Sequence, residues 1–224
     1  MVEISIFEVA GPVMIGPSSS HTAGAARLSR VARQIAAGPI KHVSFGLSGS
    51  FAKTYKGHGT DRALVAGILG LREDDERLAD SFCLAAEEGL SYDFHPIELD
   101  GFHENSVEIA METQLDGLMK VVGSSIGGGA ISIRRLNGFN VEFSSAVPTL
   151  VIFQLDKKGI ICETTRILAE NGINIGNMRV SRKGRGEIAC CVIEADSDIP
   201  PDIAAHMMRI ENVLSVRIIH GDSA

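Results

Sequence analysis

The 224-residue sequence has room for one large domain or for two smaller domains, each with a core of its own. Charged residues make up 22% of it, and the net charge is −7 without any basic block, which argues against nucleic acid or an anionic membrane as a partner. No apolar run approaches the roughly 20 residues of a membrane-spanning helix. The first residues lack a basic export signal, so we expect a cytoplasmic protein.

Residues 5–14 are predicted to form a strand, and a run rich in hydroxyl groups follows Gly16-Pro17. It consists of Ser18, Ser19, Ser20, His21 and Thr22, and an Ala-rich helix is expected over residues 23–36. Small hydroxylated side chains cap the first turn of a helix, where free N–H groups carry partial positive charge. The run therefore suits a bound carboxylate or phosphate, and His21 adds a titratable group. An ordinary helix cap beside a surface histidine is the alternative.

A second candidate segment follows a strand predicted over residues 43–47. His58 lies between two glycines, which leave the backbone open to a ligand and the imidazole little shielded. Thr60 is predicted to cap a helix over residues 60–71, with Asp61 in its first turn. A solvent-exposed loop histidine before a normally capped helix is the alternative.

Two further segments could contribute to the same cleft. His103 and Asn105 lie in a polar turn, which needs no functional explanation. Gly127 and Gly128 belong to the run Ser-Ser-Ile-Gly-Gly-Gly over residues 124–129, whose backbone N–H groups could form a concavity for an anion, although a tight strand entry is the simpler interpretation. Asn137-Gly138 between apolar runs predicts a β-hairpin.

The C-terminal third has the pattern βαββαβ, which is the ferredoxin-like order. Apolar and β-branched runs predict strands over residues 149–155, 173–181, 188–195 and 213–219, and helical spacing predicts helices from 160 to about 170 and from 200 to about 210. We therefore expect an α+β protein with one domain over residues 1–145, a linker near residues 144–148 and a second domain over residues 149–224.

The four cysteines show no CxxC spacing, and neighbouring residues of one strand point to opposite faces. We therefore expect small buried hydrophobic side chains and no metal site within this chain. They are Cys83, Cys162, Cys190 and Cys191. The histidines at positions 42, 95, 206 and 220 lack metal-ligand spacing and are expected on the surface or in packing roles.

The run from Gly16 to Gly24 resembles the substrate-site signature of the iron–sulfur-dependent bacterial L-serine dehydratases, in the beta chain of the two-subunit form. The Gly-His-Gly loop around His58 and the Ser-Ile-Gly-Gly-Gly element of residues 125–129 are similar to the same family. Glu104 departs from it, because the family more usually has proline there. The resemblance implies a mixed α/β serine dehydratase beta-chain (ASB-like) domain over residues 1–145.

The resemblance further implies deamination of L-serine to pyruvate and ammonia without pyridoxal phosphate. In that chemistry a [4Fe–4S] cluster with an open iron acts as Lewis acid. A cluster needs several thiolates that converge on one point, and the cysteines of this chain do not offer them. The cluster ligands are therefore expected on a separate alpha subunit, with an active site that forms at the contact of the two subunits.

By the same resemblance, His58 or His21 is the general base, since an imidazole with a pKa of about 6.5 can act near neutrality. The hydroxyl run is expected to bind the substrate carboxylate, with four further cleft residues beside it. The expected substrate-binding residues are Ser18, Ser19, Ser20, Thr22, His103, Asn105, Gly127 and Gly128. Which histidine takes the proton, and whether serine or threonine is preferred, stays open.

Residues 149–220 resemble an ACT domain, a module that senses small molecules beside amino-acid enzymes. In serine-binding relatives the ligand lies at a two-fold interface, which implies homodimer contacts through this domain. The positions carried over are Gln154, Asp156, Gly159 and Asn174. Asp156 departs from the amide of the serine-sensing relatives, so effector binding and pure dimerisation both stay open.

The same pair of domains is also similar to the regulatory portion of some phosphoglycerate dehydrogenases. A non-catalytic amino-acid sensor is therefore the alternative to an enzyme subunit, and a partner that only stabilises the alpha chain is a third possibility.

Overall fold

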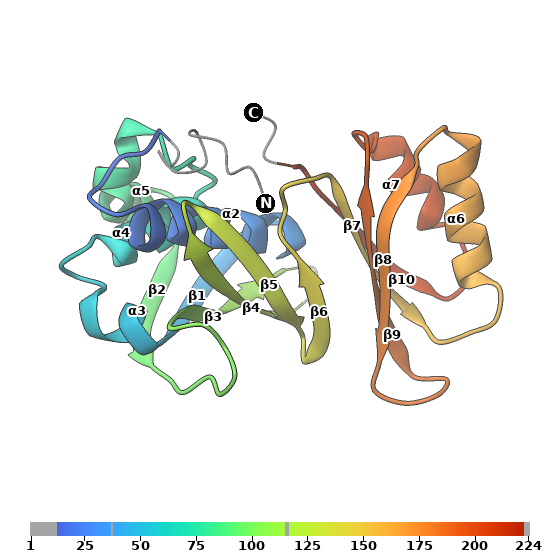
Figure 1. Cartoon of the computed structure of the whole chain (residues 1–224), viewed down its shortest axis with the longest axis horizontal. Coiled ribbons are helices and arrows are strands. Elements are labelled where there is room, and N and C mark those ends of the chain that lie inside the picture. The colour runs from blue at the N-terminus through green and yellow to red at the C-terminus, as the bar shows by residue number, and fades with distance from the viewer. Residues whose placement is uncertain (1–12, 37, 115–116, 222–224) are drawn as a thin grey trace, which may run out of the picture. The chain divides into compact units, whose positions relative to one another are not determined.

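The computed structural model describes residues 13–36, 38–114 and 117–221. Its contacts divide the chain into a first unit, Met1–Asn137, and a second unit, Gly138–Ala224. Figure 1 shows helices together with sheets in each part, and the predicted α+β class is confirmed. The strand predicted over residues 5–14 lies outside the described residues except for Val13 and Met14, which belong to no strand.

In the described residues, the first sheet has six strands in the order β2-β1-β3-β4-β5-β6. They are β1 (Ile40–Ser48), β2 (Ser91–Pro96), β3 (Asn105–Thr113), β4 (Gly117–Gly127), β5 (Ala130–Leu136) and β6 (Phe139–Phe143). β1 is parallel to β2 and antiparallel to β3, and β4 is antiparallel to both β3 and β5. Asn137 and Gly138, with φ of 44° and 80°, form the predicted hairpin turn between β5 and β6.

Helices cover one face of this sheet. They are η1 (Ser19–Ala23, a π-helical turn), α2 (Gly24–Ala36), α3 (Gly49–Thr54), α4 (Thr60–Ile68), η2 (Glu76–Asp80, a 3₁₀ helix) and α5 (Ser81–Glu87). α2 packs across β3, β4 and β5, and α4 packs on α2 (Figure 1). Leu28, Val31 and Ile35 recur at helical spacing and are buried on that side of α2.

α2 and α4 approach each other closely because Gly67 lacks a side chain. A Cβ atom at this position would lie 2.3 Å from the carbonyl oxygen of Ala26 in α2. The connection from β1 to β2 contains α3, α4 and α5, so the chain leaves β1 at Ser48 and enters the segment that carries His58 directly. The end of β1 therefore positions that segment.

The second unit contains a sheet with the order β10-β7-β9-β8 among the described residues, and neighbouring strands are antiparallel. Its elements are β7 (Thr149–Leu155), α6 (Ile160–Glu170), β8 (Ile175–Arg182), β9 (Ile188–Ala195), α7 (Pro201–Met207) and β10 (Val213–Ile219). They confirm the predicted βαββαβ order. α6 and α7 lie on the same side of the sheet (Figure 1), over a core that includes Ile152, Ile167 and Ile193. None of the helices in residues 13–36, 38–114 and 117–221 is long and apolar enough to cross a membrane.

Candidate active site

The hydroxyl-rich run forms the start of a helix, as predicted. Ser18 is the N-cap residue of η1, and its Oγ accepts a hydrogen bond of 3.1 Å from the backbone N–H of His21. The N–H of Thr22 donates to the carbonyl oxygen of Ser18 at 2.8 Å. The N–H of Gly24 donates to the carbonyl oxygen of Ser19, five residues earlier, so the helix begins with a π turn, a local geometry frequent at functional sites.

Ser19 and Ser20 are half-buried in this turn, and their hydroxyls have no hydrogen-bond partner in the described part of the chain. Thr22 is buried instead, and its Oγ1 donates to the carbonyl oxygen of His58 at 3.1 Å. Ser19 and Ser20 thus keep hydroxyls without a partner among the described residues, whereas Thr22 joins the helix start to the Gly-His-Gly loop.

The two candidate histidines are neighbours in space. The ring centroids of His21 and His58 are 4.7 Å apart, with an angle of 52° between the ring planes. The edge of His21 also meets the ring of Phe51 in α3, at 5.4 Å between centroids. The structure therefore brings together two motifs that are 36 residues apart in the sequence, from Thr22 to His58.

The surroundings of the two imidazoles differ. Nε2 of His21 lies 3.0 Å from Oγ of Ser50, and Nδ1 lies 3.4 Å from Oγ of Ser18. Neither ring nitrogen of His58 has a hydrogen-bond partner in the described part of the chain, and only its Nδ1 is fully buried. His21 is thus held at both ends, whereas His58 keeps an unpaired nitrogen.

Burial lowers the pKa of His21 below its usual value of 6.5. The neighbouring His58 lowers this pKa further, and the negative charge of Glu104 opposes both effects. His21 consequently binds a proton less readily than a free imidazole does.

Ser50 also belongs to the site, although it was not predicted from the sequence. It lies two residues after the end of β1, in the first turn of α3. Its backbone N–H donates to the carbonyl oxygen of Glu104 at 2.7 Å, and its hydroxyl meets His21. Gly49 has φ of 59°, and a Cβ atom there would lie 2.4 Å from the same Glu104 oxygen. Only glycine fits at position 49, because φ is positive there and the loop that contains Glu104 packs against its backbone.

The loop of His103 and Asn105 reaches the site through Ser50. Nδ1 of His103 accepts the backbone N–H of Asn105 at 3.1 Å, and Asn105 forms an isolated β-bridge with Gly49. Asn105 is only 6% exposed, and its Oδ1 has no partner among the described residues. A buried carbonyl without a partner is available to a ligand. The imidazole of His103 is exposed.

The glycine run forms the turn from β4 to β5. Gly127, Gly128 and Gly129 all have positive φ, between 60° and 106°, which explains why glycine stands at each of them. Ser125, at the end of β4, packs against the start of α2: a Cβ atom on Gly24 would lie 2.0 Å from Oγ of Ser125. This Oγ is fully buried and has no hydrogen-bond partner among the described residues. Among the described residues, neither Gly127 nor Gly128 forms a backbone hydrogen bond with His21 or His58.

The prediction that Thr60 caps the next helix is wrong. Gly59 is the N-cap residue, with φ of 67°, and Thr60 is already the first residue of α4. Its buried hydroxyl has no partner in the described chain. Gly59 takes the cap position because the chain turns there in a conformation that few other residues adopt. Asp61 lies in the first turn as predicted, and burial raises its pKa.

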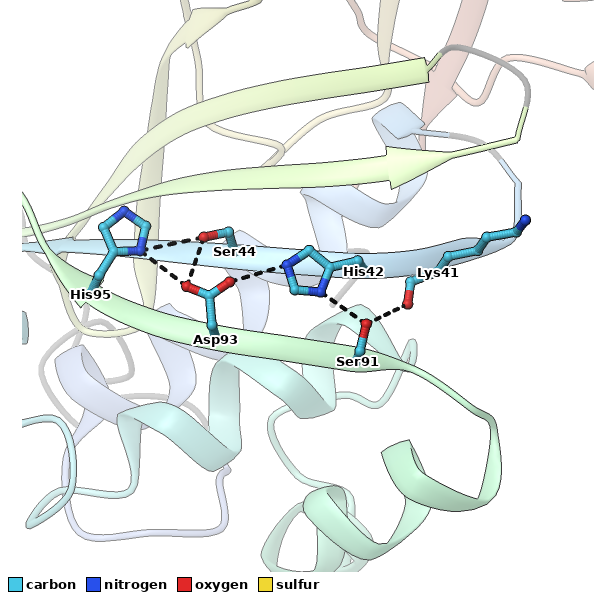
Figure 2. A network of polar contacts seen from close by, with 6 residues as sticks. All are labelled: Lys41, His42, Ser44, Ser91, Asp93 and His95. Carbon is cyan, nitrogen blue, oxygen red and sulfur yellow. Dashed lines mark hydrogen bonds and ion pairs between the residues drawn. The ribbon is translucent and has the colours of Figure 1, made fainter.

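A second polar cluster lies on the open face of β1 and β2 (Figure 2). Oδ2 of Asp93 is 3.1 Å from Nε2 of His42, and Oδ1 is 3.2 Å from Nδ1 of His95. Burial alone would raise the pKa of Asp93, but hydrogen bonds from Ser44 and both histidines outweigh it and lower the pKa. These two histidines are surface residues, as expected, and so are His206 and His220.

Comparison with known proteins identifies the family. The family model for the serine dehydratase beta chain matches residues 5–88, and the ACT domain model matches residues 148–212. A probable L-serine dehydratase beta chain of Bacillus subtilis is 40% identical over 212 residues, which cover 95% of this chain and 96% of the relative. The L-serine dehydratase beta chain of Peptoniphilus asaccharolyticus is 39% identical over 98% of this chain and 99% of its own length.

This chain belongs to the L-serine dehydratase beta-chain family. A weaker similarity is to D-3-phosphoglycerate dehydrogenase of Bacillus subtilis, which is 26% identical over 87% of this chain but only 37% of that protein. Both beta-chain relatives are named as one chain of an L-serine dehydratase, so the family is that of a subunit associated with a lyase.

The thiols of this beta chain do not suit an iron–sulfur cluster. Cys190 and Cys191 are buried neighbours in β9, and burial raises the pKa of each thiol to about 12, far from the thiolate that iron needs. The expected role as buried hydrophobic side chains is confirmed for Cys190 and Cys191. It is wrong for Cys83 in α5 and Cys162 in α6, which are exposed. In the described residues, no group of three or more His, Cys, Asp or Glu could hold a metal ion.

The four ACT positions do not meet within one serine dehydratase beta chain. Gln154 is paired through Ala189 with Arg182 at one end of the sheet, whereas Asn174 precedes β8 at the other end. The backbone N–H of Asp196 donates to the carbonyl oxygen of Asn174, and Asp196 lies seven residues along the chain from Ala189, about 23 Å of extended chain. Any site that combines Asn174 with Gln154 therefore needs a second copy of the chain.

Two of these positions are already hydrogen-bonded inside the ACT domain. Oδ2 of Asp156 accepts from Arg182 at 2.7 Å, which lowers the pKa of Asp156, and Nδ2 of Asn174 donates to Asp196 at 2.5 Å. Gly159, with φ of 93°, begins α6 and lines a cavity of about 420 Å³ between the start of α6 and the end of α7.

Proposed function

We propose that this chain is the beta subunit of an L-serine dehydratase that converts L-serine to pyruvate and ammonia, and that its first unit supplies the imidazole side of the active site. The observation that carries the proposal is the 4.7 Å contact of His21 and His58 beside the two free hydroxyls of Ser19 and Ser20. Full-length identity of about 40% to two beta chains of this enzyme supports it.

In this proposal His58 is the general base. Both nitrogens of His21 lie against hydroxyls, whereas Nε2 of His58 is unpartnered in the described chain and not fully buried. Nε2 takes the α-proton of L-serine. The imidazolium returns that proton to the departing β-hydroxyl, so that water leaves and the neutral ring is restored. The resulting aminoacrylate tautomerises to an imine, which water hydrolyses to pyruvate and ammonia.

The substrate carboxylate is bound at the start of η1 in this proposal. Ser19 and Ser20 offer hydroxyl donors there, and the first turn of a helix offers free N–H groups and partial positive charge. Asn105 contributes its buried amide oxygen, which could accept from the substrate ammonium group. This arrangement orients Cα toward the imidazoles.

The alpha subunit would hold the [4Fe–4S] cluster, because the thiols of this chain do not suit it. The site is then complete only in the complex of both subunits. The test is an omission experiment, in which pyruvate from L-serine is measured for the alpha subunit alone, for this chain alone and for the reconstituted complex. We expect turnover in the complex only. Turnover by this chain alone contradicts the shared site, and binding of L-serine without turnover in the complete complex would favour the sensor alternative.

We further propose that the second unit forms a homodimer through β8. This strand is an edge of its sheet, and it carries two exposed apolar side chains, Met178 (40% exposed) and Val180 (43% exposed). Apolar edge strands pair readily with another chain. A two-fold contact is also the arrangement that could bring Asn174 of one copy toward Gln154 of another.

A further inference from the structure

Ser50 is fixed from several sides at the point where β1 passes into α3. Its backbone N–H donates to the carbonyl oxygen of Glu104 at 2.7 Å, and its own carbonyl oxygen accepts from Oγ1 of Thr54 at 2.9 Å. Its hydroxyl lies 3.0 Å from Nε2 of His21. The backbone of Ser50 is therefore anchored, and its hydroxyl has a fixed place next to the imidazole.

The ring of His21 is held from three sides. Ser50 meets Nε2, Ser18 lies 3.4 Å from Nδ1, and the ring of Phe51 packs edge-on at 5.4 Å between centroids. A histidine whose two nitrogens both face anchored hydroxyls has a defined ring orientation. The ring of His58 packs against this fixed ring and has no hydrogen bond of its own in the described chain.

We infer that Ser50 is a positioning residue for the histidine pair: its hydroxyl fixes the orientation of the His21 ring, and His21 in turn orients the ring of His58. The inference rests on the proposed function for its catalytic consequence, although the orientation itself is a property of this chain alone. It also gives the loop of residues 103–105 a role, because the carbonyl oxygen of Glu104 holds Ser50 in place.

The orientation is tested directly by nitrogen NMR of the histidine side chains in the full chain. In the wild type we expect both ring nitrogens of His21 to show the chemical shifts of hydrogen-bonded imidazole nitrogens. In Ser50→Ala we expect the Nε2 signal to move, because that nitrogen loses its partner, and the Nδ1 signal beside Ser18 to move less. An unchanged His21 spectrum in Ser50→Ala overturns the inference.

Ser91→Ala is the matched control. Ser91 lies 2.9 Å from Nδ1 of His42 in the cluster of Figure 2, so this variant also removes a serine beside a histidine, but outside the candidate active site. We expect its His21 signals and its turnover to equal those of the wild type.

The catalytic consequence is measured in the reconstituted complex with the alpha subunit. We expect Ser50→Ala to lower kcat about tenfold or more and to change KM less than about twofold, since a misoriented base slows proton transfer and leaves substrate binding in place. The pH profile of kcat should shift as well. Equal kcat and equal pH profiles in Ser50→Ala and Ser91→Ala overturn the inference.

A second pair of variants distinguishes loss of the Ser50 hydroxyl from misfolding of the chain. Ser50→Thr keeps the hydroxyl and Ser50→Val replaces it with a methyl group of similar size, so the two differ in the hydrogen bond alone. We expect Ser50→Thr to retain more activity than Ser50→Val, and equal kcat contradicts the role of the hydroxyl. If the wild-type complex forms no pyruvate, the proposed function fails, while the NMR comparison still decides the placement of His21.

Discussion

His21 is the residue of the candidate site whose titration is most clearly altered. Burial lowers its pKa first, and the neighbouring His58 lowers it further. The folded chain therefore binds a proton at His21 less tightly than the unfolded chain does. Protonation of His21 favours unfolding, so it lowers the free energy of unfolding as the pH falls through about 6.5 toward the lowered pKa, and it has no effect well above that range.

A pH series tests this consequence. Urea unfolding of the wild type and of His21→Gln is measured from about pH 5 to about pH 8. We expect the free energy of unfolding to decline less steeply below about pH 6.5 in His21→Gln, because that variant has no imidazole to protonate. Parallel curves for the two proteins would contradict a lowered pKa of His21.

For single residues, the sequence predicted those contacts that form between residues close together in the chain. Ser18 was expected as a helix cap and is one, because the cap involves a residue three positions away. The contact of Ser50 with His21 spans 29 residues, and no local pattern marks it. Thr60 was misassigned because a hydroxyl before a helix is a weaker determinant than the left-handed turn at Gly59.

At the scale of elements, the joint between β1 and α3 is a point of close packing. Gly49 has a positive φ, and a Cβ atom there would overlap the carbonyl oxygen of Glu104 at 2.4 Å. We expect Gly49→Ala to lower the free energy of unfolding by at least about 2 kcal/mol, from backbone strain and overlap together. Chemical denaturation of the full chain measures it.

Gly89→Ala is the control for this variant. Gly89 has φ of 69°, close to that of Gly49, but a Cβ atom there meets nothing within 4 Å. It should lose only about 1 kcal/mol, the cost of the left-handed conformation. Equal losses in the two variants would show that Glu104 does not crowd Gly49.

The elements of the second unit followed from the sequence almost residue by residue, because its strands alternate or are continuously apolar and its turns contain glycine. β7, β9 and β10 have the predicted bounds. In the first unit β2, β3 and β4 were missed. β2 buries only part of Tyr92 and Phe94 and ends in Pro96, so its pattern is weak. β3 alternates clearly around Ile109, so that signal was present in the sequence.

At the scale of the whole molecule, the proposed homodimer depends on the apolar edge of β8. We expect Val180→Lys to convert a dimer of the full chain into a monomer, because a charge on an edge strand opposes pairing. Light scattering after size-exclusion chromatography measures the mass. Leu214→Lys is the control, since Leu214 is equally exposed (46%) on the opposite edge strand, β10. A dimer that survives Val180→Lys but not Leu214→Lys would place the contact at the other edge.

The central claim is that the first unit of this chain provides the base of the reaction in a complex with the alpha subunit. The most direct measurement is kcat for pyruvate formation from L-serine by that complex, with wild-type chain, with His58→Gln and with the exposed His95→Gln as control. We predict a loss of about 100-fold or more in His58→Gln and wild-type turnover in His95→Gln. Wild-type turnover in His58→Gln would contradict the account.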